Sequence, residues 1–333
     1  MSFRESATAS LIGEKALALL ESPAFWGRVN AVVTNAVYLQ GMGGELLWIG
    51  PTGHVAHRRC LQVPLGMRQV PGGTVFRNQG RRLLLGEGLS IDWAGAQLWR
   101  PERIRPDDAI PLPVLAANLV SILESVIPQC CSDGLAQAMP FLRALLPDTS
   151  RPSGNGTNGH TASCSTTLVP RESSETNPLI PGKALGAVSA VADACIHHDG
   201  GAMVQAGRGL VGLGPGLTPS GDDYLGAVLF ALSQMDLAYP GLCRWRLTPS
   251  AELVDMARSQ TNWISHTLMS DMAEGHAAEP LHRFVLRVLR DPEPGGALDE
   301  LPGLLEIGHS SGWDMLTGAL TGMLASIDPG LGL

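Results

Sequence analysis

The residues best suited to chemistry lie in a glycine-dense stretch from Gly207 to Asp223. Its last part reads Gly-Leu-Gly-Pro-Gly-Leu-Thr-Pro-Ser-Gly-Asp-Asp, and a strongly apolar run follows. Glycines let the backbone approach a ligand closely. Thr218 ahead of Pro219, or alternatively Ser220 with a carboxylate three residues later, predicts that a helix begins here.

A helix start of this kind can bind a small anion, because its first N–H groups lack intrahelical partners and its dipole is positive there. The residues expected to contact that anion are Gly214, Gly216, Thr218 and Ser220. Asp222 and Asp223 would repel it unless a proton or a divalent cation intervened, which favours a bridging Mg²⁺. The alternative is that both carboxylates only cap the helix while the glycines permit close packing.

A second motif, Gly-His-Ser-Ser-Gly-Trp-Asp at residues 308–314, repeats this design at the start of another apolar helix. Two such starts suggest one shared pocket. The predicted metal ligands are Asp222, Asp223 and Asp314, the catalytic candidates are His309, Ser310 and Asp222, and Ser311 joins the substrate-binding residues. His309 lies inside a glycine-bounded polar motif and is therefore the candidate general acid or base, or oxyanion donor.

The second helix combines a polar stripe with a face of small residues. Ser310, Asp314, Thr317 and Thr321 recur at helical spacing, and packing would not explain such a stripe. Beside it, Gly318 and Gly322 would let another helix backbone approach closely.

A third candidate region is the predicted helix Ala251–Met272. Thr261 and Ser265 fall on one face of it and are expected to contact the substrate. Solvent exposure alone would explain the neighbouring Asn262 and His266.

Several common chemistries are excluded by missing motifs. The glycine spacing does not fit a dinucleotide loop, and no Gly-Lys-Ser/Thr follows for a P-loop. The nucleophile elbow, the zinc-protease helix and the Cys-x-x-Cys pair are absent as well. An ATP-dependent kinase or ligase is disfavoured because the loop 212–223 holds no lysine or arginine, Arg208 being the nearest cation.

Composition narrows the class of protein further. The 333 residues are 44% hydrophobic and 16% charged, with a net charge of −8 and no basic stripe, which argues against nucleic acid. The longest uninterrupted apolar stretch, Tyr224–Leu232, is far short of the roughly 20 residues that span a bilayer. The 6 cysteines show no paired metal-ligand spacing, so we expect a cytoplasmic protein.

The chain is predicted to be an α+β protein, with a β-rich antiparallel N-terminal domain followed by an all-helical C-terminal domain. A short leading helix near Ala7–Leu20 precedes alternating strand patterns that extend to Trp99. The predicted divisions are a β-rich domain at 1–110, a helical connection at 111–146, a flexible Ser/Thr/Asn/Gly/Pro linker or insertion at 147–181, and a helical domain with the glycine-rich site at 182–328.

The strings Gly212–Asp223 and Gly308–Asp314 together resemble a bacterial family long described as of unknown function. That family includes the third, AllH-like, subunit of oxamate carbamoyltransferase. The resemblance extends to Thr261, Ser265 and the stretch Ala273-Glu274-Gly275, and more weakly to the β-rich start. The Pro147–Pro181 insertion departs from the family pattern.

The resemblance implies reversible carbamoyl transfer between a small amidated acid such as oxalurate and phosphate, giving oxamate and carbamoyl phosphate in purine or allantoin breakdown. It also implies other subunits of a hetero-oligomeric enzyme as partners, besides a small anionic metabolite. Because no strong nucleophile is evident, the alternative is a noncatalytic anion-sensing or assembly subunit.

Overall fold

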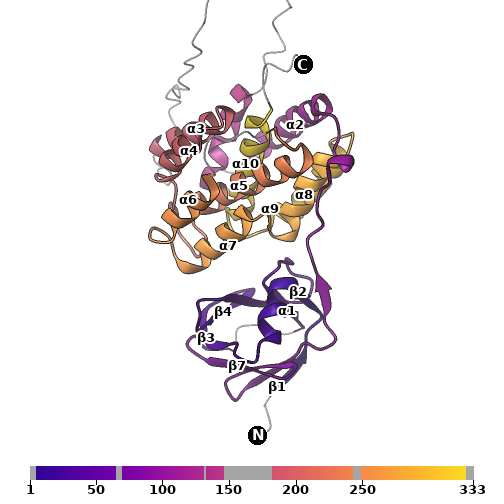
Figure 1. Cartoon of the computed structure of the whole chain (residues 1–333), viewed down its shortest axis with the longest axis vertical. Coiled ribbons are helices and arrows are strands. Elements are labelled where there is room, and N and C mark those ends of the chain that lie inside the picture. Colours follow the sequence, from indigo (N-terminus) through magenta and orange to yellow (C-terminus); the bar gives the residue numbers. More distant parts are fainter. Residues whose placement is uncertain (1–4, 65–69, 131–132, 146–181, 243–248, 328–333) are drawn as a thin grey trace, which may run out of the picture. The chain divides into compact units, whose positions relative to one another are not determined.

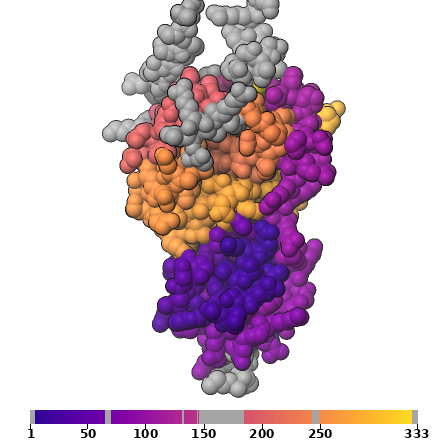
Figure 2. All heavy atoms as spheres, viewed as in Figure 1, coloured from indigo at the N-terminus to yellow at the C-terminus, as the bar shows by residue number. Residues whose placement is uncertain are grey.

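The computed structural model describes residues 5–64, 70–130, 133–145, 182–242 and 249–327 (Figure 1; Figure 2 shows the same residues with all their heavy atoms). The predicted linker 147–181 lies outside these residues. The chain divides into one unit of residues 1–103 with 276–282, and a second of residues 104–275 with 283–333. The first is β-rich and the second helical, which confirms the predicted α+β class.

The first unit is built on one ten-stranded sheet in the order β1-β9-β8-β7-β3-β4-β5-β6-β2-β10. Its strands are β1 (Glu5–Thr8), β2 (Leu11–Gly13), β3 (Trp26–Val33), β4 (Ala36–Gly41), β5 (Leu46–Pro51), β6 (Cys60–Val63), β7 (Val75–Gln79), β8 (Arg82–Leu85), β9 (Leu89–Asp92) and β10 (Gln97–Trp99). Most neighbours are antiparallel, as predicted. The pairs β1–β9, β2–β10 and β5–β6 are parallel, which the alternating pattern could not show.

The sheet closes on itself through its first residues. Strand β1 pairs with β9, whereas β2, which follows after two residues, pairs with β6 and β10 near the other end of the strand order. Ala9 donates to the Asp92 carbonyl at 2.8 Å, and Gln97 donates to the Ser10 carbonyl at 2.9 Å, so the bend itself is hydrogen-bonded. Alternate apolar side chains fill the interior; Ile12, Leu39, Phe76 and Ile91 are buried there.

The predicted leading helix Ala7–Leu20 is wrong over its first half. Only α1 (Glu14–Glu21) is helical, and the residues before it form β1 and β2. Ala7 and Ile12 are buried in the core of the sheet, so tertiary pairing overrides the local helical preference. Residues 276–282 also belong to this unit, where Glu279 donates to the Ala56 carbonyl at 2.9 Å.

The second unit consists of helices packed around α5, including the part of α8 from Arg283 onward. They are α2 (Leu112–Val126), η3 (Ile127–Gln129), η4 (Gly134–Leu145), α3 (Gly182–Ile196), α4 (Gly200–Gly207), α5 (Ser220–Ala238), α6 (Pro249–Ala257), α7 (Trp263–Ala273), α8 (Glu279–Arg290), α9 (Gly295–Leu305) and α10 (Ser311–Ala325), with η2 (Pro106–Asp108) ahead of them. Nearly every residue of α5 is buried. This central position explains the uninterrupted apolar run at Tyr224–Leu232.

Within the described residues, Leu112–Gln129 is the one stretch that is long and apolar enough, by length and composition, to cross a membrane. The core helix of a soluble protein meets the same criterion. Leu115, Leu119 and Ile122 of α2 are buried within the helical unit, consistent with a core helix.

Candidate functional site

The two polar motifs lie together at the start of neighbouring helices. Helix α5 begins Ser-Gly-Asp-Asp and α10 begins Ser-Gly-Trp-Asp. The hydroxyls of Thr218 and Ser311 are 3.2 Å apart, and those of Ser220 and Ser310 are 3.4 Å apart. We call this cluster, with Asp223 and Asp314, the α5–α10 junction.

Helices α5 and α10 lie side by side (Figure 1), and glycines on α10 permit the close approach. A Cβ atom on Gly318 would lie 2.2 Å from the Tyr224 carbonyl oxygen of α5, and one on Gly322 would lie 2.9 Å from the Val228 carbonyl oxygen. Contacts this short exclude any larger side chain. The predicted close approach of another helix to this face is therefore confirmed.

The glycine-rich loop before α5 needs backbone conformations that only glycine adopts readily. Gly212 has a φ of 72° and Gly214 a φ of 113°, and a Cβ atom on Gly214 would meet the Ser220 nitrogen at 2.9 Å. Residues 214–216 are exposed. The loop thus passes close over the start of α5 and leaves its own backbone open to solvent.

Neither predicted cap forms at the start of α5. The N-cap residue is Pro219, and no side chain caps the helix. The N–H of Gly221 instead donates to the Leu213 carbonyl at 2.9 Å, and those of Asp222 and Asp223 donate to Pro219. The hydroxyls of Thr218 and Ser220 lie instead against those of Ser311 and Ser310 at the start of α10.

The start of α10 follows the same pattern. The N–H of Gly312 donates to the Ile307 carbonyl at 3.0 Å, and that of Asp314 donates to the Ser310 carbonyl at 2.9 Å. Much of the donor capacity expected for binding an anion at these helix starts is thus already used inside the protein.

Asp222 is buried, with 1% exposure, and surrounded by donors. One carboxylate oxygen accepts the Gly212 N–H at 2.8 Å, and the other accepts the hydroxyls of Ser265, at 2.6 Å, and Thr261. Asp222 therefore joins the glycine loop and α5 to α7. The predicted site residues Thr261 and Ser265 contact this carboxylate.

Asp223 and Asp314 are also buried, but each keeps one carboxylate oxygen without a partner among the described residues. Their side chains are 5% and 0% exposed, and the oxygen concerned is Oδ2 in each. The Oδ1 atom of Asp314 accepts the Leu135 N–H at 2.6 Å. Unpartnered buried carboxylate oxygens are costly, so this pair stands out in the helical unit.

Burial raises the pKa of both carboxyl groups. It raises the pKa of Asp314 to about 6, opposed by the Leu135 N–H and the hydroxyls of Ser220 and Ser310. It raises the pKa of Asp223 well above its ordinary value, and the charge of Asp314 adds to this, while the hydroxyls of Ser311 and Thr218 oppose it. A hydroxyl from the other helix thus lowers the pKa of each carboxyl group, against the effect of burial.

His309 lies apart from these buried groups. Its side chain is 91% exposed, and its Nε2 atom is 3.3 Å from a carboxylate oxygen of Asp133. The structure therefore places Ser310 and Ser311 at the junction but turns the neighbouring imidazole towards solvent.

The predicted helix Ala251–Met272 is two helices, α6 and α7, with a break between them. Asn262 ends the break: its Oδ1 accepts the Ser265 N–H at 3.1 Å, and its Nδ2 donates to the Leu217 carbonyl at 2.8 Å. Asn262 is exposed, as expected, and in addition its side chain caps α7. Its Asn-x-x-Ser capping pattern was the signal in the sequence.

The lower half of the polar stripe on α10 has a structural explanation. The hydroxyl of Thr317 donates to the Trp313 carbonyl and that of Thr321 to the Thr317 carbonyl, both at 2.8 Å. These bonds within the helix satisfy buried threonines. The prediction that packing could not explain the stripe was wrong for these two residues.

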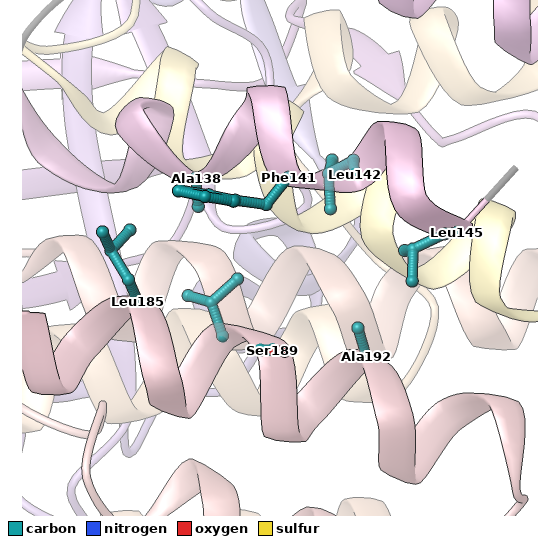
Figure 3. Close-up of a pocket in the computed structure, with 8 residues that line it drawn as sticks. Ala138, Phe141, Leu142, Leu145, Leu185, Ser189 and Ala192 are labelled. Atoms are coloured by element: carbon teal, nitrogen blue, oxygen red, sulfur yellow. The ribbon is translucent and has the colours of Figure 1, made fainter. Parts of the chain in front are cut away.

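A separate pocket lies between η4 and α3 (Figure 3). Its lining consists of Ala138, Phe141, Leu142, Leu145, Leu185, Val188, Ser189 and Ala192. Apart from Ser189 this lining is apolar, and none of the predicted site residues belongs to it. The pocket offers no group suited to transfer chemistry.

Comparison with known proteins matches one segment of the chain to a family. No solved structure matches the chain. Residues 210–323 match the family model described as oxamate carbamoyltransferase subunit AllH, and this segment contains the glycine loop, both Ser-Gly-x-Asp starts and the Thr261–Ser265 region. The resemblance found in the sequence is thereby confirmed for this segment.

Proposed function

We propose that this chain is a cytoplasmic subunit of a carbamoyltransferase that acts on small carboxylate or amide metabolites of the oxamate and oxalurate type, with the α5–α10 junction as its ligand site. The observation that carries the proposal is the coincidence of two features. The family segment contains both helix starts, and the fold brings these starts together around two buried carboxyl groups that lack partners.

The residues on the α10 side of α5 would bind the ligand, and those on the α7 side would position the loop. Thr218, Ser220, Ser310 and Ser311 supply hydroxyls that can orient a small ligand at the junction. Gly214 and Gly216 leave backbone exposed beside it. Asp222, Thr261 and Ser265 hold the loop in place through their own hydrogen bonds and act as positioning residues.

Of the three carboxylates predicted from the sequence as Mg²⁺ ligands, two remain available to bind the ion. Both carboxylate oxygens of Asp222 accept hydrogen bonds from the protein, which leaves Asp223 and Asp314. Mg²⁺ can bind through one or two carboxylates with water completing its shell. No group of three or more His, Cys, Asp or Glu side chains suited to a metal occurs among the described residues.

One observation favours the alternative, a noncatalytic anion-sensing or assembly subunit. The candidate general base His309 is exposed and pairs with Asp133 rather than with a group at the junction. In that case the reacting groups would belong to partner subunits.

The test is reconstitution of the enzyme with the subunits encoded beside this gene, purified through a tag on this chain. The assay follows carbamoyl phosphate formed from oxalurate and phosphate. Asp223→Leu should reduce the rate by about 100-fold or more in an intact complex. The matched control is Asp236→Leu, an exposed carboxylate on the same helix, which should keep the wild-type rate.

Two results would contradict the proposal. The carbamoyltransferase assignment would fall if no genes for partner subunits lay beside this gene and no reconstitution showed transfer activity. An intact complex in which Asp223→Leu is as active as the control would move the chain to the assembly-subunit alternative.

A further inference from the structure

The α5–α10 junction is rich in hydrogen-bond acceptors. Oδ2 of Asp223 and Oδ2 of Asp314 are buried acceptors without partners among the described residues. The first-turn N–H groups of Gly221 and Gly312 are already bonded to Leu213 and Ile307. A ligand that satisfies these two acceptor atoms must bring donors of its own.

The hydroxyl groups at the junction are only loosely paired. The oxygen–oxygen distances are 3.2 Å for Thr218 and Ser311 and 3.4 Å for Ser220 and Ser310. Ordinary O–H···O bonds are about 2.7–2.8 Å long. Since a hydroxyl can both donate and accept, these four groups, which also contact the two carboxyl groups, can reorient towards a ligand.

We propose that the junction binds a primary amide or ureido group, with Oδ2 of Asp223 and of Asp314 accepting its N–H groups and the surrounding hydroxyls donating to its carbonyl oxygen. This inference rests on the proposed site and specifies which end of the ligand enters it. The carboxylate or phosphate end would then lie towards the exposed residues 214–216.

Electrostatics supports an amide over an anion at this position. The two Oδ2 atoms of Asp223 and Asp314, unpartnered among the described residues, are buried acceptors, and an amide offers N–H donors without a negative charge. A carboxylate or phosphate in the same place would meet two buried carboxyl groups and be repelled by any charge they carry.

The test compares oxamate with oxalate, which have nearly the same shape but differ by an amide in place of a carboxylate. Affinities are measured by calorimetry on the whole chain. The wild type should bind oxamate about 100-fold more tightly than oxalate, because a site built to pair with N–H rejects a ligand that lacks it.

Three variants sharpen the comparison. Asp223→Leu, which removes the pairing group at similar volume, should lose the preference for oxamate. Asp223→Asn should keep oxamate binding within about tenfold, because an Asn side chain still pairs with an amide. The exposed Asp236→Leu should behave as the wild type.

The outcomes separate this inference from the proposed site. Oxalate binding as tightly as oxamate, yet still weakened by Asp223→Leu, would overturn the amide assignment and keep the site. Binding that requires Mg²⁺ and is lost in Asp223→Asn would also overturn it, in favour of a metal. Binding absent from the wild type, or unaffected by Asp223→Leu, would overturn the inference together with the site itself.

Discussion

Two buried carboxylates in the first turn of α5 differ in their hydrogen bonding, depending on which neighbouring helix they face. Towards α7, Asp222 accepts hydrogen bonds from Gly212, Ser265 and Thr261. Towards α10, Asp223 and Asp314 each leave a buried oxygen without a partner among the described residues. On the α7 side both carboxylate oxygens are hydrogen-bonded and hold the loop in place, whereas on the α10 side two carboxylate oxygens remain available to accept hydrogen bonds. Adjacent carboxylates can therefore differ completely in role.

The largest expected effect contrasts the two carboxylates directly. Asp222→Leu strands three donors in the interior, which should lower the free energy of unfolding by about 3–5 kcal/mol. Asp223→Leu removes a poorly compensated buried carboxyl and should change stability by less than about 1 kcal/mol. Urea denaturation of both variants measures the difference. Equal losses of unfolding free energy in Asp222→Leu and Asp223→Leu would contradict the difference in hydrogen bonding between the two carboxylates.

A second prediction concerns the approach of α10 to α5. Gly318→Ala should cost about 1–3 kcal/mol, since its Cβ would lie 2.2 Å from the Tyr224 carbonyl oxygen. The control is Gly186→Ala in α3, where a Cβ meets nothing within 4 Å. That change should stabilise the protein by about 0.5–1 kcal/mol, because alanine favours helix. Thermal unfolding of both variants is the measurement; a neutral Gly318→Ala would contradict the close packing.

The third prediction is a pH dependence at the unsatisfied side. Burial raises the pKa of Asp314 to about 6 from 3.8, so the folded chain binds this proton more tightly than the unfolded chain. The stability that this group contributes is therefore present below about pH 4 and is lost as pH rises towards 6. Asp314→Asn removes the titration and keeps an oxygen for the Leu135 N–H.

The variant should consequently exceed the wild type by on the order of 3 kcal/mol at pH 8 and match it near pH 4. Denaturation curves recorded between these two values test the claim. A constant difference across that range would mean that Asp314 does not titrate abnormally.

The smallest effect is expected at His309. Because its side chain is 91% exposed, His309→Ala should change the free energy of unfolding by less than about 0.5 kcal/mol. The reconstituted transfer rate should also stay within a few-fold of the wild type. A rate loss of about 100-fold with unchanged stability would instead support the catalytic role predicted from the sequence.

The sequence predicted the two-part architecture and both helix starts, because hydrophobic period and glycine spacing are local signals. It did not predict the strands β1 and β2, whose formation depends on partners such as Asp92 and Gln62, far away in the chain. Likewise, nothing local separates Asp222 from Asp223. Their difference arises from helix α10 and the Thr261–Ser265 turn, which only the tertiary fold brings to them.

The Leu135 N–H was missed for a related reason. It is a backbone donor from η4 that bonds Asp314 across the helical unit, and backbone groups leave no trace in a residue pattern. The caps at Thr218 and Ser220 were mispredicted because the loop supplies its own carbonyl acceptors.

The central claim is that the starts of α5 and α10 form one ligand site. Hydrogen exchange of the chain with and without saturating oxamate tests it most directly, because binding slows exchange where the ligand contacts or orders the backbone. We predict slower exchange in residues 212–223 and 308–314 together, and none of this slowing in Asp223→Leu. Protection confined to one of the two segments, or found only at the apolar pocket between η4 and α3, would contradict the account.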